Sequence, residues 1–296
     1  MERTLKGKII KGVGGFYTVL CENGGRIVCK ARGVFRKEGV TPLPGDEVTV
    51  SLEQKNAAVI SKIDPRRNEL IRPAVANVDV LIIVVSIREP APDLELVDKL
   101  ILYCEKQGIE PVIAVNKCDD GYADDTGYIV SQYSAAVRSI VPVSAATGFG
   151  LDGLKKLLSG KTVCLAGQSA VGKSSLINAL LGLDLKTGEL SARTERGRHT
   201  TRHAEFILTP ESGLIADTPG FSMLDSISIE PEEIPRLYPE FSDYSPLCRY
   251  PGCMHISEPG CAVKDKLREG ALNDKRYSRY VKIVNEAIEA RRHKYD

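Results

Sequence analysis

A glycine-bounded stretch at residues 167–175 constrains the fold of this chain more than any other feature. It reads Gly-Gln-Ser-Ala-Val-Gly-Lys-Ser-Ser, follows the apolar run 162–166 and precedes the apolar run 176–181. A strand, a glycine turn and a helix in this order form a P-loop, whose backbone N–H groups and helix N-terminus bind phosphate. An ordinary glycine turn before a helix is the alternative, and Gly-Lys-Ser in register behind a strand disfavours it.

The P-loop pattern predicts what its polar side chains do. Lys173 would reach the β- and γ-phosphates of a nucleotide, and the Ser174 hydroxyl would bind Mg²⁺. All members of the stretch are predicted nucleotide-binding residues: Gly167, Gln168, Ser169, Ala170, Val171, Gly172, Lys173, Ser174 and Ser175.

Two loops that follow apolar runs carry groups suited to guanine. The predicted base-binding residues in these loops are Asn116, Lys117, Asp119, Ser144 and Ala145. Asp119 can accept hydrogen bonds from the ring N–H and the exocyclic amine of guanine, which adenine does not offer in that arrangement. Asn116 would hold the loop, the stem of Lys117 would cover the ring, and the N–H of Ala145 would donate to the guanine oxygen. Asn-Lys-x-Asp is a weak pattern by itself, and its position after a buried strand strengthens it.

A third element, Asp-Thr-Pro-Gly, starts at Asp217 and fits the Asp-x-x-Gly loop of nucleotide hydrolases. Asp217 would hold Mg²⁺, and the Gly220 N–H would sense the γ-phosphate. The segment 188–203 before it is rich in Gly, Thr and Arg and ends in Arg-His-Thr-Thr-Arg-His. Thr201 is the predicted Mg²⁺ ligand there, with Thr200 as the alternative.

His199 is the candidate catalytic residue. Phe221 follows Gly220 and cannot orient an attacking water, as the glutamine at this position does in many GTPases. Hydrolysis by the chain alone is therefore expected to be slow, and His199 lies beside the threonines that would face the γ-phosphate. The alternative, in which His199 packs against the protein or contacts RNA, stays open.

The nucleotide-binding elements occur in a rotated order, because the base-binding loops precede the P-loop. In a doubly wound α/β sheet, loops at the carboxyl ends of the strands line one crevice, so the order along the chain need not alter the site. Apolar runs at 80–85, 111–115 and 162–166 are typical of strands buried on both faces. The sequence therefore predicts a circularly permuted P-loop GTPase domain at residues 69–225.

Residues 1–68 predict a small β-barrel of the oligonucleotide-binding (OB) type. Five short β-prone runs are separated by glycine-rich turns, and residues 65–68 read as a linker. Residues 1–72 carry 14 Lys and Arg against 8 Asp and Glu, whereas the whole chain has a net charge of +1. This asymmetry suggests a polyanionic partner, and a solvated basic face is the equally weighted alternative.

Basic and aromatic residues of the barrel suit RNA. Three basic residues are expected in one inter-strand loop, and three aromatics are expected near them: Arg32, Arg36, Lys37, Phe16, Tyr17 and Phe35. Stacking of bases on aromatics beside basic groups is typical of OB domains, although half-buried barrel aromatics are a commoner explanation of such residues.

Residues 226–296 predict a zinc-binding helical domain. Its predicted ligands are Cys248, Cys253, His255 and Cys261, which lie within 14 residues. Three thiolates and one imidazole complete a tetrahedral Zn²⁺ site with no open position, so the metal would be structural. Isolated reduced thiols are the alternative, and the scatter of the other five cysteines makes this cluster distinctive.

The OB-like barrel, the permuted GTPase motifs and the Cys-Cys-His-Cys set together resemble the ribosome small-subunit-dependent GTPase A family (RsgA, also called YjeQ). The resemblance implies a GTPase that binds the 30S subunit and its 16S rRNA late in assembly and is stimulated by the subunit. Mg²⁺ with GTP or GDP and one structural Zn²⁺ are the implied cofactors. A nucleotide-gated RNA-binding module with incidental hydrolysis is the alternative.

Ala170 departs from this family, which usually has glycine there. The same position carries a potassium-binding Asn in some related GTPases, so potassium dependence by that route is disfavoured. The apolar run 78–87 is interrupted by polar residues, and residues 1–4 lack the apolar core of a signal peptide. A monomeric cytoplasmic protein without a membrane partner is expected, and the lack of a predicted spanning segment opposes a membrane-transport GTPase.

Overall fold

The computed structural model describes residues 3–52, 58–119, 126–182, 204–217 and 229–295. The chain divides into two compact units, each assembled from segments that are distant in sequence. The first comprises Met1–Leu81, Leu151–Leu165 and Lys173–Phe221, and the second comprises Ile82–Gly150, Ala166–Gly172 and Ser222–Asp296. The two units are described separately below.

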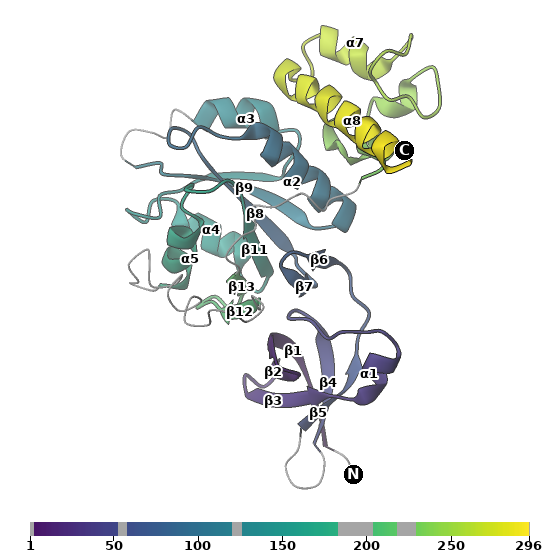
Figure 1. The fold of residues 1–296 in the computed structure, drawn as a ribbon. Coiled ribbons are helices and arrows are strands. Elements are labelled where there is room, and N and C mark those ends of the chain that lie inside the picture. The colour runs from purple at the N-terminus through teal and green to yellow at the C-terminus, as the bar shows by residue number, and fades with distance from the viewer. Residues whose placement is uncertain (1–2, 53–57, 120–125, 183–203, 218–228, 296) are drawn as a thin grey trace. The chain divides into compact units, whose positions relative to one another are not determined.

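The first unit begins with the expected five-stranded barrel (Figure 1). Its strands are β1 (Arg3–Val13), β2 (Phe16–Cys21), β3 (Arg26–Ala31), β4 (Glu47–Leu52) and β5 (Ala58–Ile63). Strand β1 pairs with both β2 and β4, and β5 pairs with both β3 and β4, which closes the sheet. Ile9, Val19, Val50 and Ile60 are fully buried inside it. Alternate residues of each strand therefore face a common apolar core.

One barrel segment differs from the sequence interpretation. The residues after β3 were expected to form a loop, and they contain the short helix α1 (Gly33–Lys37). Helix α1 carries Arg36 and Lys37, and it buries Phe35 against the barrel core. Burial of one large aromatic is enough to fix this turn on the barrel, so Phe35 is a core residue.

The segment 65–68, interpreted as a linker, is fixed by polar contacts. Arg66 donates two hydrogen bonds to the fully buried carboxylate of Asp46, at 2.7 and 2.9 Å. The Asn68 amide exchanges hydrogen bonds with the backbone of Val78 at 2.9 and 2.8 Å. A two-stranded hairpin, β6 (Glu69–Ile71) and β7 (Ala74–Ala76), follows it. Because buried polar groups need partners, these contacts hold the connection in one geometry.

Three further strands of the first unit continue the sheet beyond the barrel strand β1. They are β11 (Thr162–Ala166), β13 (Leu214–Asp217) and β12 (Glu205–Leu208), in the spatial order β11-β13-β12-β1. Strands β11 and β13 run parallel, whereas β12 is antiparallel to both β13 and β1. Helix α4 (Leu151–Leu158) precedes β11, and α5 (Lys173–Leu181) begins within the P-loop stretch. The predicted strand, turn and helix around residues 167–175 are therefore present.

The second unit contains β8 (Val80–Ser86), which starts in the first unit, β9 (Glu110–Asn116) and β10 (Ser139–Pro142). Strands β9 and β10 are parallel, and the predicted base-binding loops follow them. Every residue of β8 is buried, as expected for a strand covered on both faces. Helix α2 (Leu94–Gln107) connects β8 to β9, and α3 (Gly127–Tyr133) precedes β10. The α/β pattern of the sequence is thus confirmed.

The C-terminal part of the second unit is helical. It contains the short helices η2 (Ile234–Leu237), η3 (Pro239–Phe241), η4 (Ser245–Leu247) and α7 (Ala262–Arg268), then the long helix α8 (Asp274–Tyr295) (Figure 1). Tyr238, Phe241 and Tyr280 form the centre of its core, with ring centroids 4.9–5.1 Å apart. Within the described ranges, no helix is long and apolar enough to cross a membrane.

Candidate nucleotide and metal sites

Two glycines of the P-loop are required by close backbone approaches. Gly167 has φ 136°, and a Cβ there would lie 2.2 Å from the carbonyl oxygen of Val84. Gly172 has φ 91°, and a Cβ there would lie 2.4 Å from the Asn116 side-chain nitrogen. Both the backbone angles and the contacts exclude a larger residue. The turn therefore sits tightly against β8 and against the Asn116 loop.

Ala170 occupies a left-handed backbone conformation in the same turn, with φ 64°. This conformation costs a residue with a Cβ about 1–2 kcal/mol relative to the right-handed region. The departure from glycine noted in the sequence therefore falls at a strained position. The Ala170 side chain is exposed, so its methyl group meets no crowding that would add to the backbone strain.

Asn116 connects the P-loop to both base-binding loops. Its side-chain N–H₂ donates to the carbonyl oxygen of Val171 at 2.9 Å, and its side-chain oxygen accepts from the N–H of Ala145 at 3.1 Å. Asn116 is 2% exposed, so both contacts are protected from water. The predicted loop-holding role of Asn116 fits this geometry. The Ala145 N–H, predicted to donate to guanine, here donates to Asn116.

Asp119 is held in place by Ser144. The Ser144 hydroxyl donates to Oδ1 of the Asp119 carboxylate, and it accepts from the N–H of Thr147 at 3.1 Å. Ser144 is fully buried and Asp119 is half-buried. Lys117 has φ 67° and an exposed side chain whose ammonium donates to the carbonyl of Glu89. The carboxylate that would read guanine is thus oriented before any ligand binds.

The phosphate and Mg²⁺ side of the predicted site lies in the first unit. Lys173, Ser174 and Ser175 form the first turn of α5, and burial lowers the pKa of Lys173. A bound phosphate would oppose that effect, because a nearby anion favours the charged ammonium. Asp217 is the last residue of β13, and its backbone lies opposite Glu205 of β12. The predicted residues His199, Thr200, Thr201 and Gly220 lie outside the described residues.

Cys248, Cys253, His255 and Cys261 come together in the C-terminal part. Their ligand atoms lie within 4.8 Å of one another. His255 Nδ1 is 3.3 Å from the sulfur of Cys261 and 3.6 Å from that of Cys248. The sulfurs of Cys248 and Cys261 are 4.0 Å apart, close to the roughly 3.8 Å expected for thiolates at tetrahedral Zn–S distances of about 2.3 Å. The cluster therefore fits one tetrahedral metal ion.

Further residues orient this cluster. The other ring nitrogen of His255, Nε2, lies 3.0 Å from the Ser245 hydroxyl, which leaves Nδ1 toward the sulfurs. The Tyr277 hydroxyl donates to the carbonyl of His255 at 2.5 Å, and the Tyr280 hydroxyl donates to that of Met254. Such outer contacts set the geometry of metal ligands.

Glu258 also shapes the ligand loop. Its carboxylate accepts the N–H groups of Met254, Ile256 and Ser257 at 2.8, 2.9 and 3.1 Å. Sequence reasoning missed Glu258, Tyr277 and Tyr280. The spacing of the two tyrosines, three residues apart on one helix face, is a signal that could have indicated a shared contact.

One face of the barrel presents an aromatic residue and a cation together. Phe16 is 50% exposed, and the ammonium of Lys30 lies 4.9 Å from its ring centroid. Strands β2 and β3 pair Phe16 with Lys30 and Thr18 with Val28, and Val28 is 63% exposed. Of the three predicted barrel aromatics, Phe35 is buried, Tyr17 packs against the core and Phe16 remains at the surface.

Family models match most of this architecture. The model described as RsgA N-terminal domain matches residues 6–60, and the model described as RsgA GTPase matches residues 63–227, more than half of the chain. The chain belongs to the RsgA GTPase family. Its enzymatic class, GTP hydrolase, follows from this membership.

Curated relatives extend over nearly the whole chain. A protein from Ruminiclostridium cellulolyticum is 45% identical over 282 residues, which cover 94% of this chain and 92% of the relative. A protein from Clostridium botulinum is 40% identical over 293 residues, which cover 98% of this chain and 100% of the relative. Both are named small ribosomal subunit biogenesis GTPase RsgA.

Two solved structures share the fold of this chain. YjeQ from Thermotoga maritima is similar with a TM-score of 0.85 and 35% identity, covering 97% of this chain and 99% of that protein. YloQ, described as a circularly permuted GTPase, is similar with a TM-score of 0.82 and 33% identity, covering 97% of this chain and 96% of that protein. The predicted permuted GTPase fold is thereby confirmed.

Proposed function

We propose that this RsgA-family GTPase acts in late maturation of the small ribosomal subunit. It binds the 30S subunit and its 16S rRNA, hydrolyses GTP to GDP and phosphate, and is stimulated by the subunit. The observation that carries the proposal is the preformed guanine-type loop set centred on Asn116, in a chain whose full-length relatives carry the biogenesis name. We infer a monomer in the cytoplasm, with three domains at residues 1–68, 69–225 and 226–296.

Guanine selection rests on Asp119 in this proposal. Both its fixed orientation by Ser144 and its half-buried position support a role in binding the guanine ring N–H and amine. Asp119→Asn should weaken GTP binding by about 100-fold or more, because a site that loses a hydrogen-bond match leaves polar groups unpaired. The same variant should gain affinity for xanthosine triphosphate, whose altered edge suits an amide.

Nucleotide titration by fluorescence measures this change. Asp152→Asn, which alters an exposed carboxylate on α4, is the matched control and should bind GTP as the parent does. Equal affinity of the parent for ATP and GTP would contradict the assignment of the base site.

Mg²⁺ is held by Ser174, Thr201 and Asp217 in the proposed site. Hydroxyl and carboxylate oxygens are the hard ligands that this ion prefers. A Mg²⁺ ion held there would supply positive charge that offsets the negative charge developing on the phosphate oxygens during transfer. The first turn of α5 supplies Ser174 and the partly buried ammonium of Lys173, and the Gly220 N–H would sense the γ-phosphate.

Zn²⁺ is the proposed ion of the C-terminal cluster. A set of three thiols and one imidazole favours this metal, and four protein ligands leave no position for a reacting water. Burial raises the pKa of Cys253 to about 12, and a bound dication would reverse that effect by stabilising the thiolate. The ion thus stabilises the fold and takes no part in hydrolysis.

The exposed barrel face is the proposed RNA contact. Phe16 can stack on a base while Lys30 and nearby basic residues meet phosphates. Co-sedimentation of the full-length protein with purified 30S subunits, in a non-hydrolysable GTP analogue or in GDP, tests the function. We expect binding in the analogue, weaker binding in GDP, and loss of binding in the Phe16→Ala, Lys30→Ala double variant.

The control for this experiment is Lys62→Ala, which removes an exposed barrel cation paired with Asp64 at 2.6 Å. It should bind 30S subunits as the parent does. If the parent bound 30S subunits neither in the GTP analogue nor in GDP, the ribosomal role would be contradicted. Undiminished binding of the double variant would contradict the assigned barrel face.

A further inference from the structure

A row of three residues crosses from the barrel to the end of the GTPase strand β13. The register between β1 and β12 places Lys11 opposite Glu205, and the register between β12 and β13 places Glu205 opposite Asp217. The Lys11 ammonium lies 2.5 Å from a carboxylate oxygen of Glu205. A residue of the barrel is therefore linked, through one short strand, to the backbone of the proposed Mg²⁺ ligand.

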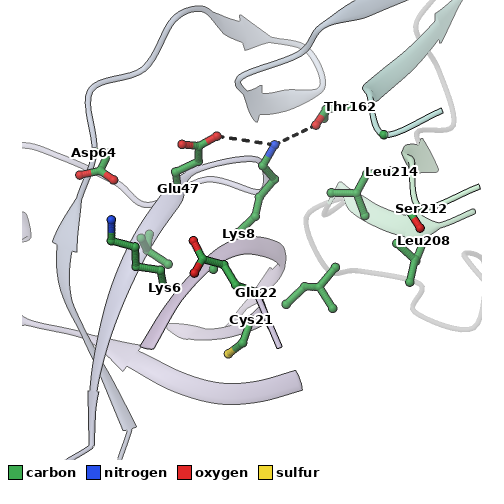
Figure 2. Close-up of a pocket in the computed structure, with 14 residues that line it drawn as sticks. Lys6, Lys8, Cys21, Glu22, Glu47, Asp64, Thr162, Leu208, Ser212 and Leu214 are labelled. Atoms are coloured by element: carbon green, nitrogen blue, oxygen red, sulfur yellow. Dashed lines mark hydrogen bonds and ion pairs between the residues drawn. The ribbon is translucent and has the colours of Figure 1, made fainter. Parts of the chain in front are cut away.

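The other end of the β12–β13 hairpin faces a cavity. This cavity has a volume of about 410 Å³ and is lined on the barrel side by Lys6, Lys8 and Glu47 (Figure 2). On the hairpin side, Leu208 and Leu214 line it. The barrel thus contacts the hairpin at the end where Asp217 lies and leaves space at the end where the hairpin turns.

A second polar contact crosses the same junction. The Lys8 ammonium donates to the Thr162 hydroxyl at 2.9 Å and lies 3.9 Å from the Glu47 carboxylate, as Figure 2 shows. Thr162 is the first residue of β11, the strand that leads into the P-loop. The barrel therefore contacts β11, the strand before the P-loop, through Lys8 beside the cavity, and it contacts β12, the neighbour of β13, through Lys11.

The Lys11–Glu205 pair is too exposed to contribute much to folding. Both side chains are 44% exposed, and exposed ion pairs add little stability. Their effect on position can be larger, because a displacement of about 1 Å at a reacting group can cost about 100-fold in rate. Strand β12 has four residues, so a contact at Glu205 acts directly on the strand position opposite Asp217.

We propose that Glu205, held by Lys11 of the barrel, is a positioning residue for Asp217 and so for Mg²⁺-dependent GTP hydrolysis. The proposal rests on the Mg²⁺ role assigned to Asp217 above. Through this pair, the position of the barrel affects the hydrolysis step rather than the affinity for GTP.

Charge reversal tests the pair in the full-length protein without ribosomes. Lys11→Glu should lower kcat by about fivefold, the lower end of coupling between distant sites, and leave KM for GTP unchanged. It should also raise the Mg²⁺ concentration needed for half-maximal turnover. Glu205→Lys should have the same effects on kcat, KM and the Mg²⁺ requirement. Combining both substitutions restores the ion pair with opposite polarity and should recover the parent kcat and Mg²⁺ requirement.

The matched control reverses another barrel ion pair. Lys62 lies on β5, which does not pair with β12, and its ammonium is 2.6 Å from the Asp64 carboxylate. Lys62→Glu should leave kcat and the Mg²⁺ requirement unchanged. The thermal unfolding midpoint should be the same for all four variants, which separates positioning from stability.

Two results would overturn the inference. One is a Lys11→Glu variant with the parent kcat and Mg²⁺ requirement, and the other is a double variant as slow as the single ones. Asp217→Ala distinguishes this failure from failure of the Mg²⁺ assignment. If Asp217→Ala leaves the Mg²⁺ requirement unchanged, the proposed metal ligand is wrong and the positioning role of Glu205 falls with it. If Asp217→Ala alters that requirement and the reversals do not, only the positioning role falls.

Discussion

The junction between α2 and α8 is filled by buried charges, whereas a solvent-open cavity lies between β1 and the turn end of the β12–β13 hairpin. In the second unit, Asp98 of α2 is fully buried and forms ion pairs with Arg276, which is 3% exposed, and Arg279 of α8. Arg276 also pairs with Glu240. In the first unit, the corresponding contact is the half-exposed pair of Lys11 and Glu205.

The two junctions differ in how much stability would be lost if one member of an ion pair were removed or displaced. A buried carboxylate that loses its cation remains desolvated, so the α2–α8 contact tolerates little displacement. A half-exposed pair such as Lys11 and Glu205 can separate at small cost, because water solvates both partners. We infer that the C-terminal domain is attached rigidly to α2, and that the contact between β1 and β12 is one that a bound partner can shift.

The largest expected effect comes from metal removal, which should destabilise the rigidly attached C-terminal domain. Cys253 and Cys261 lie in the same core as Phe241 and Tyr280, so loss of the ion should unfold residues 229–293. Structural Zn²⁺ contributes about 10 kcal/mol or more to folding of small domains. Chelation followed by limited proteolysis should cleave this region and spare the barrel, and added Zn²⁺ should restore protection.

Retained protease resistance after complete metal removal would contradict this expectation. Metal analysis that finds no zinc in protein purified without chelator would contradict the identity of the ion. Cleavage of the barrel at the same rate as the C-terminal region would show that metal removal does not unfold the C-terminal region selectively.

A smaller effect is expected when the buried cluster loses one member. Asp98→Ala should lower the free energy of unfolding by about 3–5 kcal/mol, because it leaves Arg276 and Arg279 without their shared carboxylate. Asp64→Ala, which breaks the exposed pair with Lys62, should cost less than about 1 kcal/mol. Chemical denaturation measures both. Similar costs for the two substitutions would remove the energetic basis of the comparison.

The smallest expected effect concerns Lys8, beside the cavity. Burial lowers the pKa of Lys8 below 10.5, so the folded state disfavours the charged ammonium relative to the unfolded chain. The unfolded chain then binds more protons near that pKa, and the contribution of Lys8 to stability becomes more favourable as pH rises toward 10.5.

Comparison with Lys8→Met isolates the pH-dependent contribution of Lys8 to the free energy of unfolding. The free energy of unfolding of the parent minus that of the variant should increase between neutral pH and pH 10.5. A difference that stays constant or decreases over this range would show that Lys8 is not held in a desolvated site.

Local motifs account for most of what the sequence could predict. The P-loop glycines, Asn116 and the four metal-ligand residues each belong to a short segment whose spacing follows from its chemistry. Their neighbours in space could be inferred because strands of a doubly wound sheet present their loops on one edge. The permuted order was therefore readable without a structure.

The features that sequence reasoning missed depend on strand register and on contacts between distant segments. Lys11 and Glu205 are 194 positions apart, and nothing local to either residue indicates the other. Arg66 looked like part of a linker because its partner, the buried carboxylate of Asp46, lies 20 positions earlier. Helix α1 was missed because its five residues are too few to show a period, and burial of Phe35 fixes it.

Multiple-turnover GTP hydrolysis with equal amounts of purified 30S, 50S and 70S particles tests the central claim most directly. The account predicts slow hydrolysis by the protein alone and a rise of about tenfold or more with 30S subunits, as expected when a partner orders a catalytic site. His199→Ala should lose most of that rise and keep the parent affinity for GTP. A variant stimulated as strongly as the parent would remove the role of His199. Turnover of the parent that 30S subunits leave unchanged would contradict the ribosomal function itself.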